Sequence, residues 1–125
     1  MSKPPLGILL RGGTHEAVHY AYVLATSAAA IGRPAVLFCT NAGLVALLAE
    51  NPLLADPREA LLEARKVGTL AVLAEAAEEL GVRRIACEAG MRAEGIAASS
   101  LAQGVEVAGV VTFLEAVGAG NMVSL

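Results

Sequence analysis

Short runs of apolar residues, each followed by a helical pattern, constrain the fold of this chain most strongly. The runs cover residues 6–10, 35–40 and 82–87, and none of them alternates regularly between apolar and polar residues. Continuous runs are typical of strands in a parallel sheet that is covered on both faces. Strands and helices alternate along the whole chain, which predicts a single α/β domain.

Capping and stop residues set the expected boundaries of the elements. Thr14 is the expected N-cap of a helix that runs to about Ile31, where Gly32 stops it and Pro34 prevents its continuation. Shorter elements are expected as follows: a helix over 42–50, a loop over 51–56, a helix over 91–102, a strand over 105–107, a helix over 109–117 and a last edge strand over 121–125.

A second long helix is expected in the middle of the chain. Asp56 as cap, Pro57 at the first helical position and Glu59 as partner of a capping box predict its start. It continues to Leu80, with a break or restart at residues 68–69. Its charged side chains are expected to form a solvated face: Arg58, Glu59, Glu63, Arg65, Glu75, Glu78 and Glu79.

Composition excludes several classes of protein. The chain has 125 residues, a formal net charge of −3 and 9 Lys and Arg, which is too little positive charge for a nucleic-acid-binding domain. Residues 17–49 carry one formal charge, at Arg33, but Gly32 and Pro34 interrupt them, so we expect no membrane span. The run over 6–10 is too short for a signal peptide. We therefore expect a cytoplasmic protein with both cysteines reduced.

Both cysteines fall where parallel strands end, which is the edge at which ligands bind in open α/β sheets. Cys87 ends a strand and precedes a helix, whose free N–H groups favour the thiolate form. It is the candidate catalytic residue, a nucleophilic or sulfur-carrying thiol. Cys39 is a candidate second thiol or ligand. The alternative for each is a small buried apolar residue.

Two further groups of polar residues precede or open helices. His15 and His19 match H-E-x-x-H and share a helix face, so they are candidate zinc ligands with a nearby Cys as third partner; a peptidase is disfavoured because the chain barely provides a cleft. The alternative is two polar histidines at the rim of a site or at an interface. The turn at residues 11–14, through Gly12, Gly13 and Thr14 together with Asn41, is a candidate anion site, or simply a tight turn.

The stretch over 82–91, followed by Gly95 and Ile96, resembles the DsrE/DsrF-like family of small α/β sulfur-relay proteins. Residues 104–110 and 113–115 resemble the closing segment of that family, and residues 38–40 with 43–44 resemble the turn after its second strand. The resemblance implies a three-layer, flavodoxin-like sandwich of about five mostly parallel strands. It also implies a symmetric oligomer, a homotrimer or homohexamer.

In the sulfur-relay members of that family, a cysteine at the position of Cys87 accepts a persulfide sulfur and passes it to a partner thiol. The resemblance therefore implies a sulfur carrier that works with a sulfurtransferase or another thiol protein. The residues alone leave a second function open. It is a non-catalytic oligomeric module that holds a metal, with zinc the expected one, or a small anion through His15, His19 and the Arg11–Thr14 turn.

Overall fold

Five parallel strands form one sheet in the order β4-β3-β2-β1-β5. The computed structural model describes residues 3–125. The strands are β1 Leu6–Leu10, β2 Ala35–Cys39, β3 Arg83–Cys87, β4 Glu106–Ala108 and β5 Asn121–Ser124. The helices are α1 His15–Ala30, α2 Pro57–Ala64, α3 Leu70–Glu79, α4 Glu88–Glu94 and α5 Val110–Val117, with short 3₁₀ helices η1 Asn41–Leu47, η2 Pro52–Ala55 and η3 Ala98–Ser100. The predicted α/β, flavodoxin-like sandwich is confirmed.

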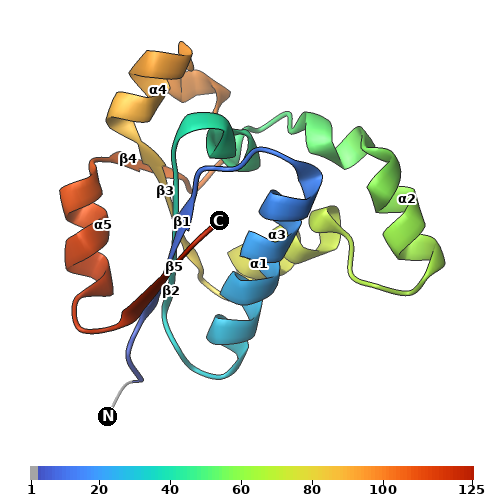
Figure 1. Ribbon diagram of the computed structural model, residues 1–125, viewed down its shortest axis with the longest axis horizontal. Helices are drawn as coiled ribbons and strands as arrows, with labels where there is room; N and C mark the ends of the chain where they lie inside the picture. The colour runs from blue at the N-terminus through green and yellow to red at the C-terminus, as the bar shows by residue number, and fades with distance from the viewer. Residues whose placement is uncertain (1–2) are drawn as a thin grey trace.

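The layers of the sandwich follow from the direction in which the chain moves across the sheet. From β1 to β4 each strand is added on the same side of the one before, and α1 and α3 lie on one face (Figure 1). The last connection returns across the sheet to place β5 beside β1. Because such crossovers are right-handed, this reversal puts α5 on the opposite face.

Alternation along the strands divides the core into two clusters. In β1, Leu6, Ile8 and Leu10 belong to the cluster beneath α1 and α3, whereas Leu9 packs against the cluster beneath α5. The α5 cluster is small and includes Phe38, whose ring stacks on that of Phe113 in α5 with 4.9 Å between ring centroids. One helix of 8 residues thus covers this side of the sheet.

The long helix α1 has its predicted boundaries. The Thr14 hydroxyl accepts a hydrogen bond from the N–H of Ala17 at 3.2 Å, which confirms Thr14 as the N-cap. Gly32 has a φ of +83°, the left-handed conformation that ends helices and that glycine adopts without strain. Within residues 3–125, no helix combines the length and the apolar character needed to cross a membrane.

Three predicted boundaries are wrong. The helix expected over 42–50 is the 3₁₀ helix η1, held to the sheet by a hydrogen bond from Gly43 N to Arg11 O at 3.0 Å. The loop expected over 51–56 contains η2, for which the Asn51 side chain accepts from Leu53 N. The helix expected over 91–102 begins earlier, and Gly95, at φ +67°, ends it after Glu94.

The stretch expected as one interrupted helix is two separate helices, α2 and α3. The break lies over residues 65–69, where Lys66 has a φ of +60°, and Thr69 caps α3 by accepting from Val72 N. Helix α2 contains no buried residue. It projects from the body of the molecule beyond α3 (Figure 1).

Candidate functional site

Cys87 has the position that the sequence predicts. It is the last residue of β3 and the N-cap of α4, and its sulfur accepts a hydrogen bond from the N–H of Gly90 at 3.4 Å. The thiol is free and partly exposed. It packs against the edge of the α5 cluster, so its sulfur lies on the α5 side of the sheet. Cys87 is therefore a partly exposed residue whose thiol is oriented by a backbone donor.

Thr40, from the end of the neighbouring strand, completes the surroundings of the thiol. A Cβ added to Gly90 would lie 2.5 Å from Thr40 Oγ1 and 3.4 Å from Cys87 Cβ. Thr40 and Cys87 therefore flank Gly90, which has to lack a side chain. The sequence analysis missed Thr40 as a site residue. Its position could have indicated a role, because Thr40 follows Cys39 at the carboxyl end of a predicted strand.

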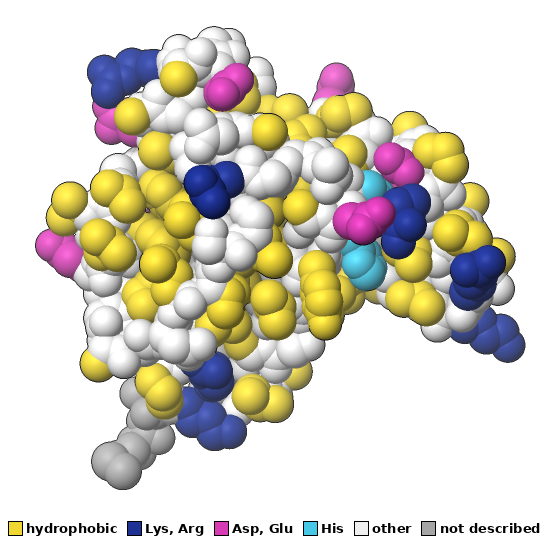
Figure 2. Space-filling view, viewed as in Figure 1, with side chains coloured by type: hydrophobic (Ala, Val, Ile, Leu, Met, Phe, Trp, Pro, Cys, Tyr) yellow, Lys and Arg dark blue, Asp and Glu magenta, His cyan; other side chains and the backbone are white. Residues whose placement is uncertain are grey.

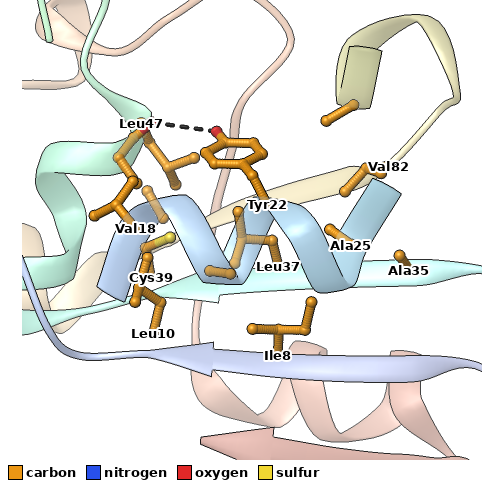
Figure 3. Close-up of a cluster of buried hydrophobic side chains, with 14 of the residues drawn as sticks. Ile8, Leu10, Val18, Tyr22, Ala25, Ala35, Leu37, Cys39, Leu47 and Val82 are labelled. Carbon is orange, nitrogen blue, oxygen red and sulfur yellow. Dashed lines mark hydrogen bonds between the residues drawn. The ribbon is translucent and has the colours of Figure 1, made fainter. Parts of the chain in front are cut away.

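Cys39 lies in the core and cannot act as a second thiol. Its side chain is fully buried beneath α1, near Leu10 and Val18 (Figure 3). Burial raises the pKa of the Cys39 thiol far above its usual value. The register explains why the two cysteines differ: Cys39 pairs with Ala86, so Cys87 is one residue further on and points to the opposite face. The prediction of a resolving thiol at Cys39 is wrong.

The glycine turn after β1 is closely packed. The N–H groups of Arg11 and Gly12 both donate to Leu125 O, at 2.9 Å and 3.3 Å. A Cβ on Gly13 would lie 2.6 Å from Ala42 O, so the turn presses against the loop after β2. The donor on Gly12 that the anion prediction invoked is therefore already used.

The two other residues of the predicted anion site have local structural roles. Thr14 caps α1, as described above. Asn41 is exposed and opens η1 in the left-handed region, with a φ of +52°. The structure brings the two loops together at the carboxyl edge of the sheet, as predicted.

The two histidines stack on each other, with 5.7 Å between ring centroids. His15 is buried, and its Nε2 lies 2.7 Å from Glu59 Oε1. His19 Nε2 lies 2.8 Å from the carbonyl oxygen of Gly68. His15 thus binds α2, and His19 binds the segment that joins α2 to α3.

Glu59 is the acceptor at the centre of this network, and its predicted place on a solvated helix face is wrong. Its carboxylate accepts from His15 Nε2, from Leu70 N at 2.7 Å and from Ala71 N at 3.2 Å. Partial burial raises the pKa of Glu59, but these hydrogen bonds outweigh it and hold the pKa below its usual value. The carboxylate caps α3 rather than its own helix. No local pattern predicts this, because His15 is 44 residues away in the sequence.

The residues do not fit the predicted zinc site. Within residues 3–125, no three His, Cys, Asp or Glu side chains gather in a way that could hold a metal ion. The Nε2 atoms of both histidines face Glu59 and Gly68 instead of converging on a common point. The histidines therefore serve the packing of α2 and α3 against α1.

Cys87 lies at the carboxyl end of β3 and is partly exposed. A hollow of about 470 Å³ does occur at the same end of the molecule, but Cys87 does not line it. The residues that line the hollow are Leu48, Ala49, Glu50, Gly95, Ile96, Ser99 and Ser100.

Comparison with known proteins shows the fold. No family model and no curated protein matches the sequence. The chain is similar in structure to the YchN protein from E. coli, with a TM-score of 0.66 and 14% identity over 98% of this chain and all of that one. It is also similar to MTH1491, a protein of unknown function from Methanobacterium thermoautotrophicum, with a TM-score of 0.67 and 16% identity over the same shares.

Proposed function

We propose that this protein is a sulfur carrier, with Cys87 as the residue that holds the transferred sulfur as a persulfide. The observation that carries the proposal is the contrast between its cysteines. Cys87 is partly exposed at the end of β3 and is oriented by Gly90 N, whereas Cys39 is sealed in the core. The resemblance to the DsrE/DsrF-like family supports the same residue.

The transfer is a thiolate substitution at sulfur. The Cys87 thiolate attacks the outer sulfur of a donor persulfide, a new S–S bond forms, and the S–S bond of the donor breaks. The donor leaves as a thiolate, so the numbers of atoms and electrons balance without an oxidant or reductant. A thiolate of the acceptor then attacks the outer sulfur in the same way and releases Cys87.

The partners of such a carrier include proteins. A partly exposed thiol at the end of a strand can meet a sulfurtransferase as donor and a second thiol protein as acceptor. The chemistry belongs in the cytoplasm, where thiols stay reduced.

Mass spectrometry after incubation with a sulfurtransferase and thiosulfate tests the proposal. The peptide that contains Cys87 is expected to gain the mass of one sulfur atom, which a reductant removes. Cys39→Ala is the matched control and is expected to take up sulfur like the wild type. Equal labelling of Cys87→Ser would contradict the assignment.

We also propose that the protein forms a symmetric homo-oligomer, a homotrimer or homohexamer, in which another copy covers exposed apolar side chains of α5 and β5. Four apolar side chains on this side are about half exposed or more: Val110 50%, Val111 64%, Leu114 53% and Met122 48%. We call them the α5 surface. Hydrophobic side chains gather over α5 in Figure 2. Residues 105–125 contain no Lys or Arg, and exposed apolar patches of this kind mark contact sites between proteins.

A further inference from the structure

We infer that Arg11 makes the Cys87 site selective for anionic sulfur compounds, an inference that rests on the proposed sulfur-carrier function. It comes from the strand register at the carboxyl edge. There Arg11 directly follows β1, Thr40 directly follows β2, and Cys87 is the last residue of β3.

Arg11 follows Leu10, the last residue of β1, and continues the pairing of that strand. Its N–H donates to Leu125 O, and Leu125 N donates to Leu9 O, so the pairing with the segment after β5 extends past Leu10. Leu9 packs on the α5 side. Because side chains alternate along an extended strand, Arg11 falls on the α5 side as well.

The pairing registers align the three residues. Leu10 pairs with Cys39, which sets Arg11 beside Thr40, and Cys39 pairs with Ala86, which sets Thr40 beside Cys87. Thr40 has extended backbone, with φ −145° and ψ 170°, so its side chain also alternates to the α5 side. Two strand spacings, about 10 Å in all, separate the backbones of Arg11 and Cys87. A long arginine side chain lying over Thr40 can span most of that distance.

The polar groups of this row are free to bind a ligand. Arg11 is exposed, and within residues 3–125 its side chain takes part in neither an ion pair nor a hydrogen bond. The Thr40 hydroxyl does not cap the helix that follows it. The acidic residue next to Cys87 in the sequence is Glu88, which is exposed at the start of α4. Arg83 falls on the same face of the sheet, but its side chain is paired with Glu106, whereas that of Arg11 is unpaired.

An unpaired guanidinium on the same face of the sheet as a nucleophilic thiol favours reagents and products that carry negative charge. A small donor with an anionic group next to its transferable sulfur would place that group over Thr40, within reach of Arg11. When Cys87 takes the sulfur, the electron pair of the broken S–S bond leaves on the anionic fragment, which the guanidinium stabilises. The substrate class is therefore an anionic carrier of sulfane sulfur.

Two alkylating agents of nearly equal shape test this selectivity: iodoacetate, which is anionic, and iodoacetamide, which is neutral. We expect Arg11→Gln to lower the rate ratio of iodoacetate to iodoacetamide at Cys87 about threefold to tenfold at low salt. Arg11→Lys is expected to restore the ratio in part, and added salt to reduce the effect of Arg11. Arg65→Gln, on the exposed α2–α3 linker, is the matched control for net charge and should leave the ratio unchanged.

The outcomes separate this inference from the function on which it rests. A reactive Cys87 whose rate ratio is the same in wild type and Arg11→Gln would overturn the role of Arg11 and leave the sulfur carrier standing. An equal fall in both rates would also overturn it, because selectivity would be unaffected. A Cys87 that reacts with neither reagent in the wild type would overturn both proposals.

Discussion

At the scale of single residues, the two cysteines show how one step of register decides between a core residue and a site. Each ends a strand, and the sequence alone places both at the carboxyl edge. Cys39 points beneath α1 and is fully buried, whereas Cys87 points to the α5 side and is partly exposed. The sequence does not reveal the pairing of Cys39 with Ala86, which is fixed by the packing of the whole sheet.

Gly90 should not tolerate a side chain. We expect Gly90→Ala to lower the free energy of unfolding by about 1–3 kcal/mol, because the new methyl would lie 2.5 Å from Thr40 Oγ1. Urea denaturation measures the change. Gly109→Ala is the control, since nothing lies within 4 Å of a Cβ there and its backbone is unstrained. Equal stability of the two variants would show that Thr40 does not pack against Gly90.

At the scale of elements, one carboxylate ties α2 to α1 and to the start of α3. Helix α2 has no buried residue, so packing contributes little to its position. Glu59 binds His15 on α1 and the first N–H groups of α3, and His19 binds the linker at Gly68. The joint between α2 and α3 is thus held by polar contacts to α1, which also account for the H-E-x-x-H spacing.

Replacement of Glu59 should weaken this joint in a pH-dependent way. We expect Glu59→Gln to lower the free energy of unfolding by about 1–3 kcal/mol near neutral pH, because charge-assisted hydrogen bonds are lost. The pKa of Glu59 is lowered in the folded protein, so its ionised form contributes stability above the unfolded value of about 4.3. That contribution is lost as the pH falls through the lower folded pKa.

Denaturation curves measured from neutral pH down to the acid limit of solubility test this prediction. The difference between wild type and Glu59→Gln should shrink below about pH 4. Glu63→Gln, on the exposed face of the same helix, should show no difference at any pH. A gap that grows towards acid pH would mean that the carboxylate does not act in its ionised form.

The sequence predicted the elements better than the contacts between them. Apolar runs, caps and stops located the strands and α1, because these signals act over a few residues. The end of α4 at Gly95 was missed, since the pattern beyond it stays apolar and small. The role of Glu59 was missed because a capping box explained it locally, while its partners lie on other elements.

At the scale of the whole molecule, the strand order leaves the α5 side thinly covered. The reversal after β4 places α5 alone over β1 and β2, and Cys87 lies on that side. The fold class could be predicted from alternating elements, and the family resemblance pointed to the strand number. Neither indicated which face would remain apolar and exposed, because this depends on the handedness of the crossovers.

Self-association through the α5 surface can be tested by a substitution that introduces one charged side chain there. We expect the wild type to sediment as a trimer or hexamer and Val111→Glu to sediment as a folded monomer, because Val111 is 64% exposed and contributes little to the fold of one chain. Val72→Glu, on α3 at 57% exposure, is the matched control and should keep the wild-type state. A Val111→Glu variant that assembles like the wild type would exclude the α5 surface as the interface.

The alkylation rates of the two cysteines in the native protein test the central claim most directly. Iodoacetamide at neutral pH, followed by peptide mass spectrometry over time, resolves the reaction at Cys87 from that at Cys39. The predicted result is modification of Cys87 within minutes, while Cys39 reacts only after denaturant unfolds the protein. Protection of Cys87 equal to that of Cys39 in the folded state would contradict a sulfur carrier built on this thiol.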